Sequence, residues 1–230
     1  MGSLAIIPAR GGSKRIPRKN IKEFLGKPII SYSIDAALSS GLFDEVMVST
    51  EDKMIADIAL QYGACVPFYR SVENADDYAT TLEVIDEVIE RYKQEGKKFD
   101  NICCIYPTAP FVSSSKLIEA FKLLIDQKYD AVVPVMAFSF PIQRSLKLEG
   151  GKLSYNFPEY ENSRSQDLEK LYHDTGQFYF LKVSELKQNK SLVPSHTGAI
   201  VISELEAQDI DNEIDWKLAE LKYELLQSTK

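Results

Sequence analysis

The chain has 230 residues, of which 44% are hydrophobic and 27% are charged, an ordinary composition for a globular protein. Its 34 acidic and 27 basic side chains give a net charge of −7, which excludes a generally basic nucleic-acid binder. The longest apolar stretch, 131–138, has eight residues, whereas crossing a bilayer takes roughly 20, so we expect no membrane span. The chain is long enough to form a core without disulfides, and its three cysteines favour a reducing, cytoplasmic compartment.

Short β-branched runs alternate with segments of helical spacing along the first 135 residues. Thr80 and Glu83 form a capping-box pattern at the start of one of these helices. The alternation is typical of βαβ units around a mostly parallel sheet, so it predicts an α/β fold. The predicted strands are 4–9, 45–50, 64–68, 101–106 and 130–135, and the predicted helices are 28–39, 52–62, 81–92 and 115–126.

The alternation stops after Met136. Residues 137–172 are aromatic and polar without a clear period, which indicates an inserted arm in an otherwise single domain covering 1–230. Strands are predicted again at 177–183 and 199–203. The final predicted helix, 213–226, has one apolar stripe, formed by Ile214, Leu218, Leu221 and Leu225.

The loop after the first predicted strand carries a concentrated positive charge. Between Arg10 and Lys27 there are seven basic residues and one acid, a local charge of +6 in a chain whose remainder has −13. Gly11, Gly12 and Ser13 offer backbone N–H groups that can form an anion-binding nest. A loop at the carboxyl end of a strand in an open α/β sheet is where ligands bind, so we expect a polyphosphate here. The alternative is a solvated basic loop, and neither the P-loop nor the dinucleotide-binding glycine pattern is present.

Two acids near the C-terminus form a candidate metal site. Asp209 and Asp211 stand two residues apart, so in an extended segment both carboxylates point the same way and can share one cation. Oxygen ligands of this kind suit Mg²⁺, which keeps several waters and bridges to substrate phosphates. The alternative is that Asp211 only caps the final helix.

The segment from Ile6 to Asn20, IIPARGGSKRIPRKN, resembles the opening motif of the CMP-sugar-acid synthetases, the cytidylyltransferases of sialic, legionaminic, pseudaminic and related acids. The resemblance extends over nearly the whole chain, and two stretches, 162–167 and 172–179, are most similar to the pseudaminic acid branch. Other matching segments are Ser49 to Asp52, Arg70 with Ala79 to Thr81, Tyr106 to Pro110, and Asp209 to Asp211.

The resemblance implies a three-layer α/β sandwich with a mixed, mostly parallel sheet. It also implies an enzyme that joins CTP to a nonulosonic sugar acid at the anomeric hydroxyl and releases pyrophosphate, with Mg²⁺ as cofactor. The implied catalytic residues are Arg10, Lys19 and Asp211, and the implied metal ligands are Asp209 and Asp211. The implied nucleotide-binding residues are Ala9, Arg10, Gly11, Ser13, Lys14, Lys19, Asn20, Arg70, Ala79 and Thr81.

The resemblance implies less about the sugar acid. Tyr106, Arg164 and Gln166 match positions near the acceptor, although many relatives have Gln in place of Tyr106. It also implies that residues 137–172 form a dimerisation arm that reaches a second subunit, so we expect a homodimer. The aromatic side chains of this arm support that expectation, because a free arm would leave them in water.

Several alternatives remain. The acceptor could be sialic, legionaminic or 3-deoxy-octulosonic acid, and the chain could be a non-catalytic nucleotide sensor. A Rossmann dehydrogenase fits the alternation but not the glycine spacing. Taken alone, Arg70 could form a surface salt bridge with Glu73 or Asp77. The proton acceptor stays open between metal-bound hydroxide, water and the substrate's own carboxylate.

Overall fold

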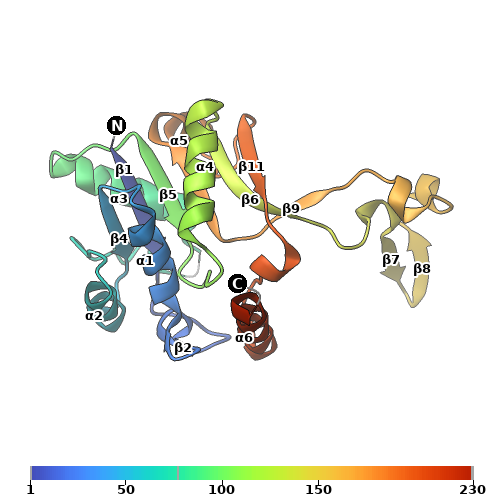
Figure 1. Cartoon of the computed structure of the whole chain (residues 1–230), viewed down its shortest axis with the longest axis horizontal. Coiled ribbons are helices and arrows are strands. Elements are labelled where there is room, and N and C mark those ends of the chain that lie inside the picture. Colours follow the sequence, from blue (N-terminus) through green and yellow to red (C-terminus); the bar gives the residue numbers. More distant parts are fainter. Residues whose placement is uncertain (1, 77, 229–230) are drawn as a thin grey trace.

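The computed structural model describes residues 2–76 and 78–228, and its centre is a mixed sheet of seven strands in the order β11-β6-β10-β5-β1-β4, with β9 beside β6 (Figure 1). The pairs β1–β4, β1–β5 and β6–β11 are parallel, whereas β10 and β9 run antiparallel to their neighbours. The mostly parallel sheet is therefore confirmed. The strands are β1 (Ser3–Pro8), β4 (Glu45–Ser49), β5 (Asn101–Ile105), β6 (Ala131–Ala137), β9 (Tyr172–Asp174), β10 (Phe178–Lys182) and β11 (Thr197–Val201).

Helices cover both faces of this sheet. Alternation along β1 places Ala5 and Ile7 in one apolar cluster and Leu4 and Ile6 in another. Side chains of α1, α2 and α4 pack into the first cluster, and those of α3 and α5 into the second, which gives the predicted three layers. The helices are α1 (Ile29–Ser40), α2 (Lys53–Gln61), α3 (Thr81–Gln94), α4 (Ser114–Asp126), α5 (Val183–Asn189) and α6 (Glu213–Ser228).

The cysteines agree with the strand alternation. Cys103 lies in the first cluster and Cys104 in the second, so neighbouring thiols in β5 point to opposite faces of the sheet, as predicted. All three cysteines are free. No described helix combines the length and the apolar character needed to cross a membrane.

A third apolar cluster joins the last helix to the first loop. Phe24 makes edge-to-face contacts with Tyr32 and Trp216, and Ile16 and Ile210 are buried in the same cluster. This packing holds the segment before α6 against the basic loop, although about 190 residues separate them in the sequence. The loop itself contains η1 (Lys19–Ile21) and the short strands β2 (Glu23–Phe24) and β3 (Lys27–Pro28).

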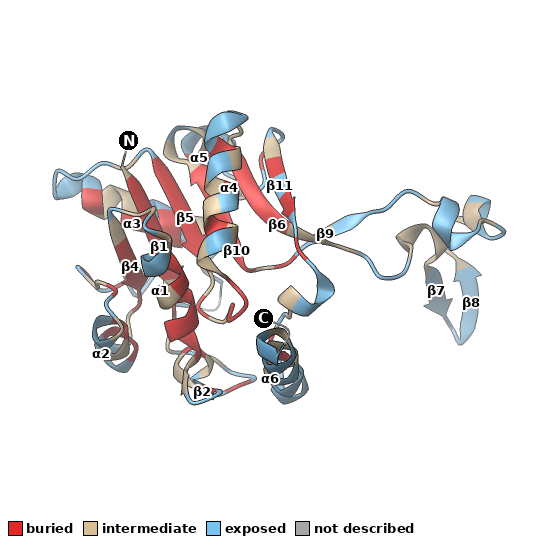
Figure 2. Cartoon of the chain, in the orientation of Figure 1, coloured by how far each residue is buried: buried red, intermediate tan, exposed pale blue. Residues whose placement is uncertain are grey.

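The segment between β6 and β9 projects from the body of the protein, where the arm was predicted (Figure 1). It leaves β6 at Ala137 and returns at Tyr172, and these two residues pair across the β6–β9 ladder. Many residues of this segment are exposed to solvent (Figure 2). The arm contains the hairpin β7 (Leu146–Glu149) and β8 (Lys152–Tyr155) and the short helices Ile142–Arg144, Pro158–Tyr160 and Ser165–Asp167; another short helix, Glu204–Glu206, lies before α6.

Two sequence predictions differ from the structure, and the sequence left open which face of the last helix is buried. Residues 64–68 do not form a strand but make one bridge, from Cys65 to Met47, because Pro67 has no N–H with which to extend a ladder. The strand predicted to end at Val183 is followed by the unpredicted helix α5, which Val183 begins. The apolar stripe of α6 is exposed, and the opposite face, with Trp216 and Ala219, is buried instead.

Candidate functional site

A cavity of about 410 Å³ lies at the carboxyl end of β1. Pro8 and Arg10 come from this strand end, and Lys19 and Asp211 approach from the first loop and from the segment before α6. The site is therefore built where an open α/β sheet usually binds ligands. The lining residues are Pro8, Arg10, Ser13, Lys14, Arg15, Ile16, Lys19, Asn20, Arg70, Ala79, Thr81, Val84, Tyr106, Pro107, Thr108 and Asp211.

The structure divides the basic loop into two groups of side chains. Arg10, Lys14, Arg15 and Lys19 line the cavity. The other three basic residues contact acids elsewhere: Arg18 lies 3.6 Å from Asp52, Lys22 2.7 Å from Glu213, and Lys27 2.6 Å from Asp35. Four of the seven cations of the loop therefore line one cavity, which favours an anion-binding loop over a merely solvated one.

Lys19 is more enclosed than Lys14 and Arg15, which are both exposed. Its ammonium group donates a hydrogen bond of 2.5 Å to the carbonyl of Ile210 and lies 4.0 Å from a carboxylate oxygen of Asp211. Burial lowers the pKa of Lys19, while the charges of Asp211 and Asp209 oppose that change. Asn20, buried beside it, donates to the carbonyl of Arg10 at 2.9 Å and so fixes the two ends of the loop together.

Arg70, Ala79 and Thr81 also line this cavity. Arg70 is 8% exposed and donates to the side chain of Ser49 at 3.0 Å and to its carbonyl at 2.5 Å. Burial lowers the pKa of Arg70, and the carboxylates of Glu51 and Glu87 partly offset this effect. An arginine enclosed in this way is not a surface salt bridge; Asp77, one partner considered for it, lies outside the described residues.

Two predicted nucleotide-binding residues, Ala9 and Gly11, are not among the lining residues. Ala9 is fully buried. The N–H of Gly11 donates to a carboxylate oxygen of Glu51 at 2.6 Å, and a Cβ at this position would lie 2.7 Å from Asp52. Glycine is required here because the loop packs tightly against the start of α2.

A second cavity of about 490 Å³ adjoins the first. Tyr106 and Thr108 line both cavities, and the Tyr106 hydroxyl lies 3.0 Å from that of Thr81. Burial raises the pKa of Tyr106, so the phenol stays neutral at ordinary pH. The remaining lining residues of the second cavity are Ala109, Phe111, Met136, His173, Asp174, Thr175, Gly176, Gln177, Glu204, Ala207, Gln208, Asp209 and Lys222.

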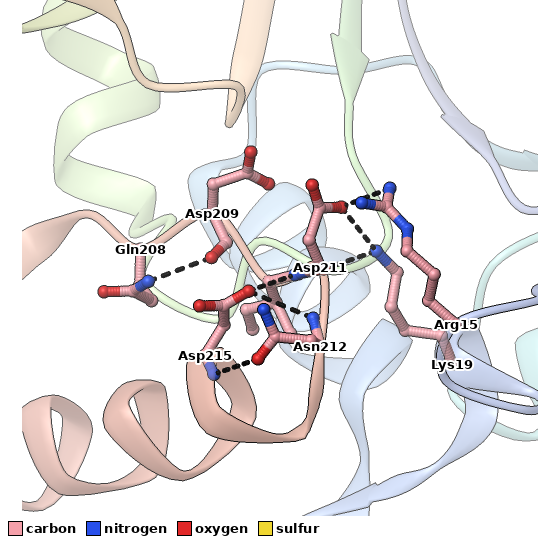
Figure 3. A network of polar contacts seen from close by, with 8 residues as sticks. Arg15, Lys19, Gln208, Asp209, Asp211, Asn212 and Asp215 are labelled. Atoms are coloured by element: carbon pink, nitrogen blue, oxygen red, sulfur yellow. Dashed lines mark hydrogen bonds and ion pairs between the residues drawn. The ribbon is translucent and has the colours of Figure 1, made fainter. Parts of the chain in front are cut away.

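Asp209 and Asp211 lie on either side of the junction between the cavities. Asp211 lines the first cavity, where Arg15 contacts it at 2.7 Å, and Asp209 lines the second (Figure 3). The cap of α6 is Asn212, whose side chain accepts from the N–H groups of Ile214 and Asp215. The alternative of Asp211 as a helix cap is therefore wrong. Within the described residues no group of three or more acidic, histidine or cysteine side chains could hold a metal.

Arg164 and Gln166 are exposed and belong to the arm. Neither lines either cavity, so the described chain alone does not bring them to the site. Tyr106 is the one predicted sugar-binding residue that lies at the junction.

The sequence prediction also missed residues of the second cavity. Lys222 projects from α6 and donates to the carbonyls of Glu204 and Ala207 at 3.1 and 2.9 Å. Gln177, which is 5% exposed, donates to the carbonyl of Glu206 at 2.5 Å. A buried glutamine has no sequence signal, and Lys222 has none either, because the sequence does not show which face of the last helix is turned inward.

Comparison with known proteins agrees with this geometry. A family model described as cytidylyltransferase matches residues 4–197. The chain is 42% identical to the pseudaminic acid cytidylyltransferase of Campylobacter jejuni over 226 residues, which cover 98% of this chain and 97% of that protein. It is 34% identical to the CMP-N,N'-diacetyllegionaminic acid synthase of Legionella pneumophila, covering 99% of this chain and 98% of that one.

Solved structures show the same fold. The CMP:2-keto-3-deoxy-manno-octonic acid synthetase, solved as a complex with CTP, superposes with a TM-score of 0.71 at 16% identity and covers 99% of this chain and all of that one. A mixed α/β sheet with a cationic cavity beyond its first strand is the arrangement of an anion-binding α/β protein. More narrowly, the chain belongs to the cytidylyltransferase family.

Proposed function

We propose that this protein transfers CMP from CTP to the anomeric hydroxyl of a nonulosonic sugar acid, with pseudaminic acid as the first choice of acceptor. Membership of the cytidylyltransferase family and 42% identity to a pseudaminic acid cytidylyltransferase support the assignment. The observation that carries it is the pair of adjoining cavities, one lined by five cations and the other by one.

The first cavity has the charge distribution that a nucleoside triphosphate requires. Arg10, Ser13, Lys14 and Lys19 line it, and they would neutralise the phosphates. Arg70, with Ser49 holding its guanidinium, and the backbone beside Ala79 also line it and offer donors and acceptors for cytosine. Thr81 and Asn20 would contact the ribose region. This arrangement supports a base beside Arg70 and a triphosphate beside the cations of the basic loop.

The acceptor would occupy the second cavity and meet the nucleotide at Tyr106 and Thr108, which line both. Its anomeric hydroxyl oxygen attacks the α-phosphorus and forms a P–O bond, while the bond from that phosphorus to the bridging oxygen breaks and pyrophosphate leaves. The hydroxyl proton passes to water or to the acceptor's own carboxylate. Positioning and charge stabilisation account for most of the catalysis in such a step. Arg10 and Lys19 would balance the negative charge that moves to the leaving group.

Asp209 and Asp211 would hold a Mg²⁺ ion, with substrate phosphates and waters completing its coordination. These two residues suit the ion, because their carboxylates flank the junction of the cavities. Carboxylate oxygens are the ligands that a hard cation such as Mg²⁺ prefers. When bound, the ion supplies orientation and charge neutralisation for the triphosphate. Arg15, now 2.7 Å from Asp211, would then turn to the phosphates.

The homodimer is the second part of the proposal. The projecting arm, 137–172, exposes Phe138 and Phe140 by 39% and 60%, and Leu148 and Leu153 by 70% and 66%. In a dimer the arm would cover these side chains against the partner and would carry Arg164 and Gln166 toward its acceptor cavity. Light scattering tests the association, and a monomer at micromolar concentration would contradict it.

Mass spectrometry of the product is the decisive experiment. The protein is incubated with CTP, Mg²⁺ and an equimolar mixture of pseudaminic, legionaminic, sialic and 3-deoxy-octulosonic acids. We expect CMP-pseudaminic acid as the main product. The 34% identity to a legionaminic acid synthase makes CMP-legionaminic acid the second candidate. Absence of any CMP-sugar, with CTP still bound, would favour a non-catalytic nucleotide sensor and contradict the proposal.

A further inference from the structure

Helix α6 has two apolar faces, and only one of them is covered by the chain itself. Trp216 and Ala219, at 3% and 0% exposure, pack into the cluster around Phe24. On another face Ile214 is 78%, Leu218 42% and Leu221 64% exposed. A helix that is apolar on both sides is normally buried on both sides, and a row of exposed aliphatic side chains marks an interaction surface.

The spacing of the exposed row identifies the kind of partner. Ile214, Leu218 and Leu221 are separated by four and three residues, and Leu225, 49% exposed, continues the series with a further four. This is the 3.5-residue repeat of a coiled-coil seam, in which the row of one helix packs against the row of another helix. A partner helix therefore matches this face better than the flat hairpin of the arm does.

The charges beside the seam fit a second copy of the same helix. Exposed Lys217 and Glu224 flank the row on one side. In an antiparallel pair of α6 helices, with Leu218 opposite the partner's Leu221, each Lys217 comes next to a Glu224 of the partner. In a parallel pair Lys217 would face Lys222 instead, and like charges repel.

We propose that α6 packs antiparallel against α6 of a second copy of this chain, through Ile214, Leu218 and Leu221. The flank on the other side of the helix is already occupied, because Asp215 accepts from the N–H of Asp211 and Lys222 donates to the carbonyl of Ala207. The relative orientation of the two α6 helices is therefore determined by Lys217 and Glu224. A seam of three turns is smaller than the roughly 800 Å² per partner of a stable interface, so it acts together with further contact surface.

The seam also bears on the site. Asp211 lies directly before α6, and Lys222 of the same helix lines the second cavity. Pairing of two α6 helices would hold both residues from the side away from the core. The inference concerns association alone, and it can fail while the proposed reaction stands.

Charge reversal is the sharpest test. Lys217→Glu and Glu224→Lys each turn two attractive contacts per dimer into repulsive ones, so each alone should weaken self-association about tenfold in analytical ultracentrifugation. The double variant Lys217→Glu/Glu224→Lys should restore the dissociation constant to within about twofold. Single variants that associate as tightly as the original protein, or a double variant as weak as the singles, would overturn the pairing. CTP binding checks that each variant is folded.

Cysteine cross-linking tests the register. Two differently tagged proteins, Leu218→Cys and Leu221→Cys, are mixed and oxidised under mild conditions. The antiparallel pair predicts a disulfide mainly between the two tags, since each Cβ faces the other position of the partner. The unmodified protein is the background control, because Cys103 and Cys104 are buried and Cys65 is half-buried. Links mainly within each tag would indicate a parallel pair, and no link in either combination would indicate a different occupant such as the arm; both results contradict the proposal.

Discussion

The two cavities adjoin at Tyr106 and Thr108 but are assembled in different ways. Six lining residues of the first cavity, from Arg10 to Lys19, come from one loop with an excess of positive charge. The second takes its lining from several separate segments, and Lys222 is its one lysine or arginine among the described residues. The positive charge that binds a triphosphate can come from one segment of the chain. The shape and polarity of a sugar-binding cavity depend on side chains from many segments. The first kind of site is visible in a sequence and the second is not.

The largest effect is expected from the acid that borders the first cavity. Asp211→Asn keeps the size of the side chain but removes the charge that would hold Mg²⁺, so we expect kcat to fall by about 10²- to 10³-fold. Pyrophosphate release at saturating CTP and acceptor measures it. Glu213→Gln is the matched control, because Glu213 is an exposed acid two residues away that contacts Lys22. Equal losses in both variants would show a general charge effect and contradict the metal assignment.

The sequence predicts the first cavity well because its signals are local. The cations, the capping box at Thr80 and the alternation in β1 all depend on residues close together in the chain. The prediction could not tell which cations reach the cavity, because Lys22 and Lys27 belong to the same basic loop as Lys19 and are distinguished by the acids, Glu213 and Asp35, that they contact in the fold. It misassigned 64–68, where a single bridge replaces a strand, and it could not show that the apolar row of α6 faces outward.

Lys19 should matter for CTP binding more than other lysines of the same loop. Lys19→Ala removes an enclosed cation, and we expect the dissociation constant for CTP to rise about 10- to 100-fold in calorimetry. Lys27→Gln removes the same charge from the loop outside the cavity, and it should change the constant less than about twofold because Lys27 contacts Asp35. Equal effects would mean that net charge, and not the position of Lys19, governs binding.

The same lysine gives a pH dependence. Burial lowers the pKa of Lys19, so as pH rises the ammonium group is lost earlier than in an ordinary lysine, and CTP affinity should decline on the alkaline side. Lys19→Arg keeps the cation, because arginine stays protonated, and should move this decline to higher pH. Calorimetry from pH 7 to 10 measures both proteins. Identical alkaline profiles would show that Lys19 does not titrate in the binding step.

Lys222 tests the second cavity. Lys222 is the cation that lines this cavity, where it can approach the carboxylate of the acceptor. We therefore expect Lys222→Met to raise KM for the sugar acid about tenfold. The dissociation constant for CTP should stay within about twofold, because Lys222 does not line the first cavity. A loss of CTP affinity of the same size as the rise in KM would contradict the separation of the two cavities.

The smallest effect is expected at the support of the basic loop. Asp52 begins α2 by accepting from the N–H groups of Met54 and Ile55 at 2.8 and 3.2 Å, and it lies 3.6 Å from Arg18. Asp52→Ala removes both contacts and should lower the free energy of unfolding by about 1 kcal/mol in urea denaturation. Asp52→Asn can still cap the helix but has no charge for Arg18, so it should lose only a fraction of that amount, because exposed ion pairs contribute little.

The pair of variants also shows how the loop is held. The side chain of Asp52 packs against Gly11, and neighbouring Glu51 accepts the N–H of that glycine. If the helix start positions the loop through packing and capping, Asp52→Asn should leave CTP binding within about twofold of the original protein, and Asp52→Ala should weaken it further. If instead the two variants lose stability and CTP affinity equally, the contact with Arg18 is the dominant one. The first cavity would then depend on charge for its shape as well as for its ligand.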